Sequence, residues 1–342
     1  MNRTHKFRQG MLLALAMFTA VLVFAAPQRC ADALHAGLVL CGGPLLGFAF
    51  QPAARVIGVR AKAAGSVLLI GFLGGFAPAA AAAAQAVRTG QLTPRQASVL
   101  LPACVCSGPS FVILTVGEQM LGNRALGVRL FAAQLLAGYL TAALLCRMQG
   151  GAGQCLPAKA EEIPLPTLDA VVAQAAVTYL KLCGFVLYFR LLAAGAETLL
   201  PKPWSVLPAM LLEVCTGCDC ASRTGLWAST LCCAALSVQG ASVLLQVRTI
   251  CPPEVSLGPL LAARVLHLPL SLALFWLVVP GTEQAVQAFS TLSGRVAVMH
   301  RVPLDCALLA FAVCCITVAE LQKRCSGQCG VLHDQHKKTA AR

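Results

Sequence analysis

Two carboxylates sit in an otherwise apolar part of this chain, and they are its clearest candidates for chemistry. Glu213 and Asp219 flank a short polar stretch that also contains Thr216. Carboxylates within membrane segments are candidates to bind a coupling proton or sodium ion. The alternative is that each is neutralised by a neighbouring cation, Arg223 or Arg264. The two carboxylates are therefore candidates either for ion binding or for structural pairing.

Two apolar runs are interrupted by small and polar residues, which makes each interruption a second kind of candidate site. The first interruption comprises Ser107, Gly108, Pro109 and Ser110, and the second comprises Ser237, Gln239, Gly240 and Ser242. An unwound helix leaves carbonyl and amide groups free to contact a solute or an ion. The alternative is a structural kink whose freed backbone groups are satisfied by neighbouring helices.

The two interruptions occupy equivalent places in an internal repeat. Residues 96–146 and 227–277, aligned 131 positions apart without a gap, share 13 identities in 51 positions. A composition this rich in Ala and Leu gives about four or five by chance, so the alignment favours a duplication. Paired broken helices are typical of a solute site near the middle of the bilayer.

Composition identifies the solvent around these segments. Apolar residues make up 58% of the chain and charged residues 11%, and the mean hydropathy is +0.76. Such a chain cannot build a water-soluble surface, but it can build one that faces lipid. The net charge of +13 is spread over short loops and fits anionic headgroups, with no basic run interleaved with aromatics that would predict a nucleic-acid partner.

Two apolar stretches predict re-entrant hairpins rather than simple spans. Residues 65–84 contain Gly74, Gly75 and Pro78 near their centre, which interrupt a helix and join the candidate substrate-binding residues. Residues 204–223 end in a polar segment in which Gly217 can turn the chain. A polar turn at membrane depth requires burial in protein or a water-filled cavity.

These elements predict an all-α polytopic membrane protein with inverted repeats of re-entrant hairpin, broken helix and transmembrane helix. Three crossings separate the copies, an odd number, so the copies face opposite ways. The predicted organisation is a cytoplasmic N-terminal end with a first transmembrane helix (1–29), half 1 (30–150), a linker and connecting helix (151–200), half 2 (201–280), and a last transmembrane helix with a basic cytoplasmic tail (281–342). Apolar residues 11–26 can alternatively serve as a signal peptide.

Other charged residues receive weaker roles. Arg264 and His267 share one helical face, where they can contact an anionic substrate or balance Glu213. Lys181 is deep if its helix is straight and reaches the interface if it faces lipid. Glu118 and Arg190 lie near helix ends and are expected to be solvated.

The chain contains 18 cysteines, which raises the question of a metal site. Most lie in apolar runs, where cysteine behaves as a small hydrophobe. The tail places Cys325, Cys329, His333 and His336 at zinc-like spacing, against the alternative of a basic tail without metal. No motif of an enzyme is present, so we expect neither catalysis nor a cofactor.

Several segments resemble the nucleoside-recognition, or Gate, domain, most closely in the YlbJ-type sporulation integral membrane protein family. In the first half these segments are Gly71–Pro78, Gly90–Ala97, Ser107–Ile113 and Val116–Gly117; in the second half they are Leu212–Gly217, Ala235–Gln239 and Ala262–His267. The resemblance covers about residues 30 to 280. It implies the inverted-repeat fold of concentrative nucleoside transporters.

The resemblance further implies a multi-pass protein of the mother-cell or forespore membrane. The chain departs from the family pattern at Phe76, at the alanines 79–84, and at Cys104 and Cys106, where the family has more polar groups. We expect either a carrier of a small polar or anionic solute, nucleoside-like by resemblance, or a non-transporting membrane factor of spore envelope or cortex maturation. The oligomeric state stays open.

Overall fold

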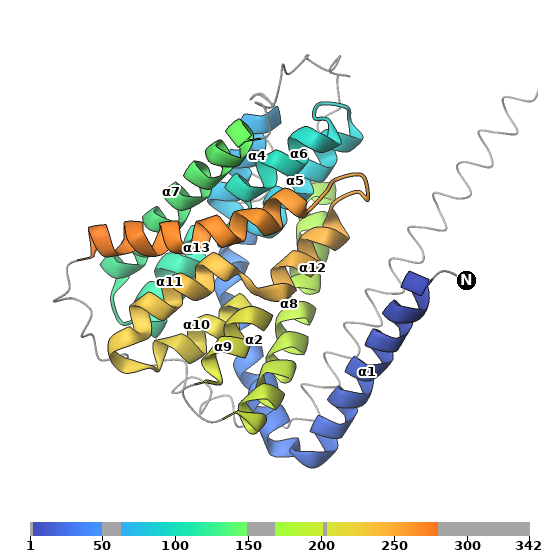
Figure 1. Ribbon diagram of the computed structural model, residues 1–342, viewed down its shortest axis with the longest axis vertical. Coiled ribbons are helices and arrows are strands. Elements are labelled where there is room, and N and C mark those ends of the chain that lie inside the picture. The colour runs from blue at the N-terminus through green and yellow to red at the C-terminus, as the bar shows by residue number, and fades with distance from the viewer. Residues whose placement is uncertain (1–2, 50–62, 149–167, 201–203, 280–342) are drawn as a thin grey trace, which may run out of the picture. The chain divides into compact units, whose positions relative to one another are not determined.

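The computed structural model describes residues 3–49, 63–148, 168–200 and 204–279, all within one contact unit that spans 1–296. These residues form helices and contain no strand (Figure 1). In chain order the elements are α1 (Arg3–Ala25), α2 (Pro27–Ala49), α4 (Ala63–Gly74), α5 (Phe76–Arg88), α6 (Pro94–Cys104), η1 (Ser110–Met120), α7 (Arg124–Met148), α8 (Leu168–Leu199), α9 (Val206–Leu212), α10 (Val214–Ser222), η2 (Gly225–Trp227), α11 (Ala228–Val238), α12 (Gly240–Ile250) and α13 (Gly258–Val278). Residues 151–167 of the predicted linker, and the predicted last transmembrane helix with its basic tail (281–342), lie outside the described residues.

Several helices are long and apolar enough to cross a membrane. Among the described residues there are four such segments, namely Arg124–Leu145, Ala176–Glu197, Gly225–Ile250 and Gly258–Val278, and up to five if the bent pair α1–α2 is one span. At about 1.5 Å per residue, 20 residues match the hydrocarbon core of a bilayer. The chain is therefore a multi-pass membrane protein.

The same order of elements occurs twice along the described chain. In each case two short helices joined at a break are followed by a broken helix and then by a long helix. The first series is α4, α5, α6, η1 and α7, and the second is α9, α10, α11, α12 and α13. We call α4 with α5 hairpin 1 and α9 with α10 hairpin 2, since the two arms of each pack against each other.

The two long helices that end the series lie side by side, as Figure 1 shows for α7 and α13. Each exposes large apolar side chains, among them Leu136 and Leu140 on α7 and Val265 and Leu277 on α13. In a water-soluble protein such a surface would be an aggregation hazard, whereas in a bilayer it faces lipid tails of the same polarity.

Small residues let the elements around the breaks approach closely. The arm α5 buries Ala77, Ala79, Ala80 and Ala83, and it packs against α4, α6 and α12. Without a hydrophobic driving force between helices in lipid, close van der Waals contact between small side chains is what holds them together. The alanine run 79–84, which lacks polar groups, therefore serves packing in this fold.

Hairpin 2 turns at a different residue from the one predicted. The break between α9 and α10 is at Glu213, whose φ of −154° and ψ of 130° are extended. Gly217 instead lies inside α10, where an added Cβ would come within 2.7 Å of the Cα of Met210. Its lack of a side chain serves the close contact of the two arms, not a turn.

Candidate functional site

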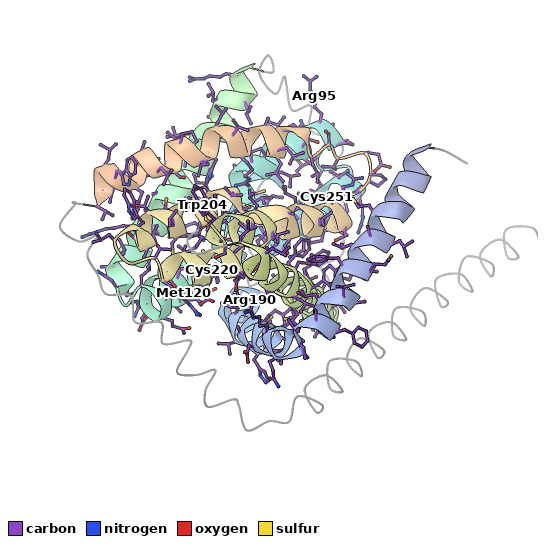
Figure 2. All side chains as sticks on the ribbon, turned by 60° about the horizontal axis from the view of Figure 1, so that its bottom comes forward. Arg95, Met120, Arg190, Trp204, Cys220 and Cys251 are labelled. Carbon is purple, nitrogen blue, oxygen red and sulfur yellow. The ribbon has the colours of Figure 1, made fainter. Side chains whose placement is uncertain are left out.

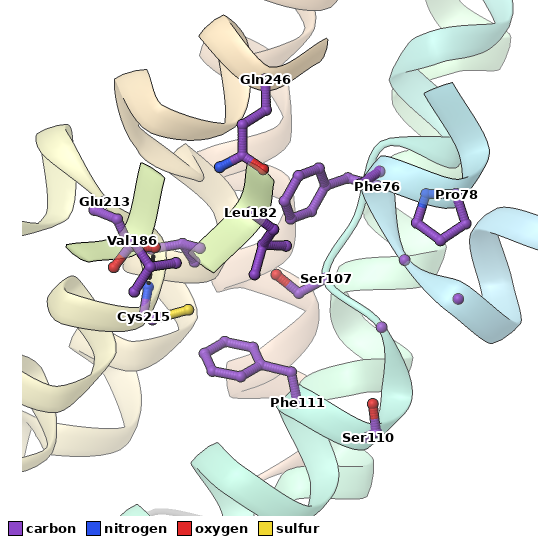
Figure 3. Close-up of a pocket in the computed structure, with 15 residues that line it drawn as sticks. Phe76, Pro78, Ser107, Ser110, Phe111, Leu182, Val186, Glu213, Cys215 and Gln246 are labelled. Atoms are coloured by element: carbon purple, nitrogen blue, oxygen red, sulfur yellow. Dashed lines mark hydrogen bonds between the residues drawn. The ribbon is translucent and has the colours of Figure 1, made fainter. Parts of the chain in front are cut away.

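A cavity of about 30 Å³ lies where both hairpins meet the first broken helix. Its walls come from residues 74–78 of hairpin 1, from Ser107, Gly108, Ser110 and Phe111, from residues 213–215 of hairpin 2, from Gln246 on α12, and from Leu182 and Val186 on α8. Figure 3 shows Ser107 between the rings of Phe76 and Phe111 in that view. Segments more than 100 residues apart therefore close around one small space.

The tip of hairpin 1 packs directly on the first break, which we define as residues 105–109. Gly75 joins α4 to α5 at φ 85° and ψ −167°, a conformation that side chains with a Cβ rarely adopt. A Cβ at Gly75 would lie 2.8 Å from the backbone nitrogen of Gly108. Pro78 fits in the first turn of α5, where its missing N–H leaves no helical bond unmade.

The first break is where α6 ends and η1 begins. Pro109, just before η1, lacks the N–H that a continuous helix would need. The helical hydrogen bonds of α6 therefore stop at Val105, and those of η1 begin after Pro109. Ser110 opens η1, and its hydroxyl is buried without a hydrogen-bond partner among the described residues. Ser110 is one of the residues that line the cavity, so its unpaired hydroxyl is a candidate hydrogen-bonding group for a solute.

At the tip of hairpin 2, Glu213 uses its carboxylate to cap α10. Its Oε1 accepts from the backbone N–H of Cys215 at 2.9 Å and its Oε2 from that of Thr216 at 2.6 Å. A carboxylate in this place satisfies orphan amides and offsets the positive end of the helix dipole. Glu213 is only 1% exposed, borders the cavity, and forms no ion pair within the described residues.

The second break, at Gln239, packs on hairpin 2 as the first break packs on hairpin 1. Gln239 is left-handed at φ 61°, and Gly240 follows at φ 71°. A Cβ at Gly240 would lie 2.8 Å from the backbone nitrogen of Glu213. In both halves, then, a glycine of positive φ brings a hairpin tip and a broken helix into backbone contact.

The two breaks also meet each other. Gln239 donates from Nε2 to the carbonyl of Val105 at 3.1 Å. Arg264 on α13 donates from Nη2 to the same carbonyl at 2.7 Å and from Nη1 to the carbonyl of Ser237 at 3.3 Å. These bonds satisfy the carbonyls that the breaks leave without helical partners. Arg264 does not pair with Glu213.

Ser237 and Ser242 do not line the cavity, and each takes part in a polar network. Ser237 bonds to Gln134 and to Ser271, so it joins α11 to α7 and α13. The Oγ of Ser242 accepts from Nε2 of Gln246 at 3.0 Å, which holds the Gln246 amide beside the cavity. Both serines are fully buried.

Asp219 is buried and lies in a charge cluster far along α10, together with buried Arg190 and the more exposed Arg223 and Glu197. It accepts from Nη2 of Arg223 at 2.8 and 2.9 Å and lies 3.7 Å from Nη2 of Arg190, which is itself 3.6 Å from Glu197. Figure 2 labels Arg190 beside Cys220, to which it donates. For Asp219 the alternative to ion binding, pairing with Arg223, is therefore the arrangement in the structure. The expectation that Arg190 is solvated is wrong, since it is 8% exposed and ties α8 to α10.

Among the predicted site residues, the cavity gathers about half. Those that border it are Gly74, Gly75, Pro78, Ser107, Gly108, Ser110 and Glu213. Those that do not are Pro109, Thr216, Asp219, Ser237, Gln239, Gly240, Ser242 and Arg264. Of these, Gln239 and Arg264 donate to the carbonyl of Val105 and so join the two breaks, and Gly240 contacts the backbone of hairpin 2 at Glu213. Lys181 is exposed on α8.

Sequence reasoning missed the apolar walls and Gln246. Phe111, Leu182 and Val186 look like ordinary core or lipid-facing residues in the sequence, and Phe76 stood out only as a departure from the family pattern. Gln246 had a signal, because it lies one helical turn after Ser242 within an apolar run.

No group of three or more His, Cys, Asp or Glu side chains suited to a metal ion occurs in the part of the chain that the structure describes. The tail residues Cys325, Cys329, His333 and His336 lie outside it. Comparison with protein-family models, with curated proteins and with solved structures found no match.

Proposed function

We propose that this protein is a sporulation-associated membrane carrier with a transporter-like Gate fold, and that it binds a small polar or anionic solute where its two hairpin tips and its first break meet. The observation that carries this proposal is the shared cavity, because its walls come from both hairpins and from the first broken helix. A site between paired broken elements is what alternating access requires.

The proposal includes an inverted repeat of the kind found in concentrative nucleoside transporters. The recurring order of helices supports it, as does the matched contact of each hairpin tip with its own break at Gly75 and Gly240. The odd number of crossings predicted between the copies places them in opposite orientations.

Helix ends and side chains around the cavity support a solute rich in oxygen atoms. The N-termini of α5, η1 and α10 border the cavity, and such termini attract oxygen atoms that carry negative charge. Glu213 offsets part of this positive potential and accepts bonds from hydroxyl or amino groups. The rings of Phe76 and Phe111 offer apolar faces. Together these groups suit a small polar or anionic solute, nucleoside-like by resemblance.

The volume of the cavity supports a closed conformation. A single water needs about 10–15 Å³ of cavity volume, and this cavity has about 30 Å³, so a nucleoside needs the hairpin tips to separate. Movement of a hairpin against its break is the step that would admit a solute, with a proton or sodium ion as coupling ion if transport is driven.

The test is thermal unfolding of the purified full-length chain in detergent with nucleosides, nucleotides or small anions. A bound solute raises the apparent Tm by mass action. We expect a saturable rise for one class of compound in the wild type and a smaller rise in Gln246→Ala. Gln85→Ala, an exposed glutamine on α5, is the matched control. No rise with any compound, or equal rises in both variants, argues against a site at this cavity.

The alternative is a non-transporting membrane factor of spore envelope or cortex maturation. The observation that favours it is the second arm of hairpin 1, whose alanines are buried in packing contacts and offer no side-chain hydrogen bonds to a solute. Both proposals predict that deletion leaves vegetative growth normal and lowers the yield of heat-resistant spores. Only the carrier predicts that Gln246→Ala lowers that yield at normal protein abundance.

A further inference from the structure

Two negative helix ends converge on one arginine. Val105 is the C-terminal cap of α6, and α11 ends at Val238, one residue after Ser237. The C-terminus of a helix carries roughly half a negative elementary charge, so two such ends together present about one. The guanidinium of Arg264 donates to both terminal carbonyls, at 2.7 Å and 3.3 Å, and supplies one positive charge.

Nothing else among the described residues neutralises Arg264. The arginines that form ion pairs among the described residues are Arg190 and Arg223. The Nε of Arg264 is buried and has no hydrogen-bond partner among them. A cation at membrane depth is costly unless its charge is matched. The two helix ends supply the matching charge, and the second donor on Val105, Gln239, is neutral.

Unwound carbonyls and half-helix C-termini are the groups with which membrane carriers coordinate free sodium ions. We infer that the guanidinium of Arg264 takes the place of such an ion at the junction of the two breaks, where the carbonyls of Val105 and Ser237 meet. As a cation tethered to the chain, it neutralises this junction without a free alkali cation. Removing this charge turns the junction into a binding site for Na⁺ or K⁺. The inference does not rest on transport, and it holds for a carrier or for a non-transporting factor.

Two substitutions separate charge from hydrogen bonding. Arg264→Lys keeps the positive charge and loses the forked donor, whereas Arg264→Gln keeps amide donors and loses the charge. Arg248→Gln is the matched control, because Arg248 also donates to a backbone carbonyl, that of Val255 at 3.0 Å, from an exposed position.

The measurement is the apparent Tm of each full-length protein in detergent, in NaCl, KCl or choline chloride at equal ionic strength. We expect Arg264→Gln to unfold several degrees lower than the wild type in choline and to recover saturably in Na⁺ or K⁺. The wild type, Arg264→Lys and Arg248→Gln should lack this additional response.

The comparison between variants decides the outcome, since a cation bound elsewhere would affect the wild type and every variant alike. An Arg264→Gln protein that responds to the three salts as the wild type does overturns the inference. If Arg264→Gln cannot be purified in any salt, Arg264→Lys is decisive. An Arg264→Lys protein as stable as the wild type then supports the tethered charge. An Arg264→Lys protein that also cannot be purified in any salt overturns the inference, because it shows that the forked guanidinium donor, not the charge, is required.

Discussion

Replacing Gly75 with alanine tests the contact between the tip of hairpin 1 and the first break. Two costs add at this position. The backbone at φ 85° and ψ −167° lies in a region essentially restricted to glycine, which costs about 1–3 kcal/mol for alanine. The new Cβ would also lie 2.8 Å from the backbone nitrogen of Gly108, and overpacking of this kind costs about 1–3 kcal/mol. The sum is about 2–6 kcal/mol.

Two other glycines separate these costs. Gly90 has φ 70° but no atom within 4 Å of an added Cβ, so Gly90→Ala pays only the left-handed strain of about 1–2 kcal/mol. Gly65 is helical with open space, so Gly65→Ala should be neutral or stabilising by up to about 1 kcal/mol. The apparent Tm of the purified variants should therefore be highest for Gly65→Ala, lower for Gly90→Ala and lowest for Gly75→Ala.

The steric contact also predicts a functional effect. Because relief of the clash must move the backbone at Gly108, Gly75→Ala should displace Ser107 and Ser110 and weaken solute binding, whereas Gly90→Ala should not. A Gly75→Ala protein as stable as Gly90→Ala would refute the reasoning, since it would mean that the tip and the break do not touch.

Three further predictions concern the second half, the charge cluster and the topology. Gly240→Ala should lower the apparent Tm more than Gly225→Ala, because both glycines have positive φ but only Gly240 contacts the backbone of hairpin 2; equal losses would contradict this. Asp219→Asn should cost about 3–5 kcal/mol of stability, because it removes the buried carboxylate from Arg190 and leaves it only Glu197, whose side chain is 34% exposed; exposed Glu118→Gln should change stability by less than about 0.5 kcal/mol in the same unfolding assay. Cysteines placed at Gly90 and Gly225, in a chain freed of its native cysteines, should react with an impermeant reagent from opposite faces of the membrane; labelling of both from one face would exclude inverted halves.

The positions of the breaks follow largely from local sequence. Pro109 cannot continue a helical ladder, and Gly75 accepts a conformation that other residues avoid, so the breaks in α4–α5 and α6–η1 occur within the predicted segments. Hairpin 2 shows where local reasoning fails. Its turn at Glu213 is extended backbone that any residue adopts, and Gly217 serves packing instead.

The residues that complete the candidate site were harder to predict. Phe111 and Val186 do not differ in sequence from residues that face lipid, because apolar side chains suit a cavity wall, a protein core and a bilayer alike. Arg190 near the end of an apolar run looked solvated, yet carboxylates on two different helices draw it inward. Such pairings depend on neighbours that the sequence does not place.

The sequence by itself determined that the chain lies in a lipid bilayer, which segments are apolar, and where the backbone leaves the helix. Hydropathy and dihedral preference are properties of residues that are neighbours along the chain. Only the tertiary structure decided which of these points meet. Val105 receives Gln239 from 134 residues away and Arg264 from 159 residues away. A carbonyl freed by a break must find a donor within the membrane, but which donor comes within reach depends on how the helices pack.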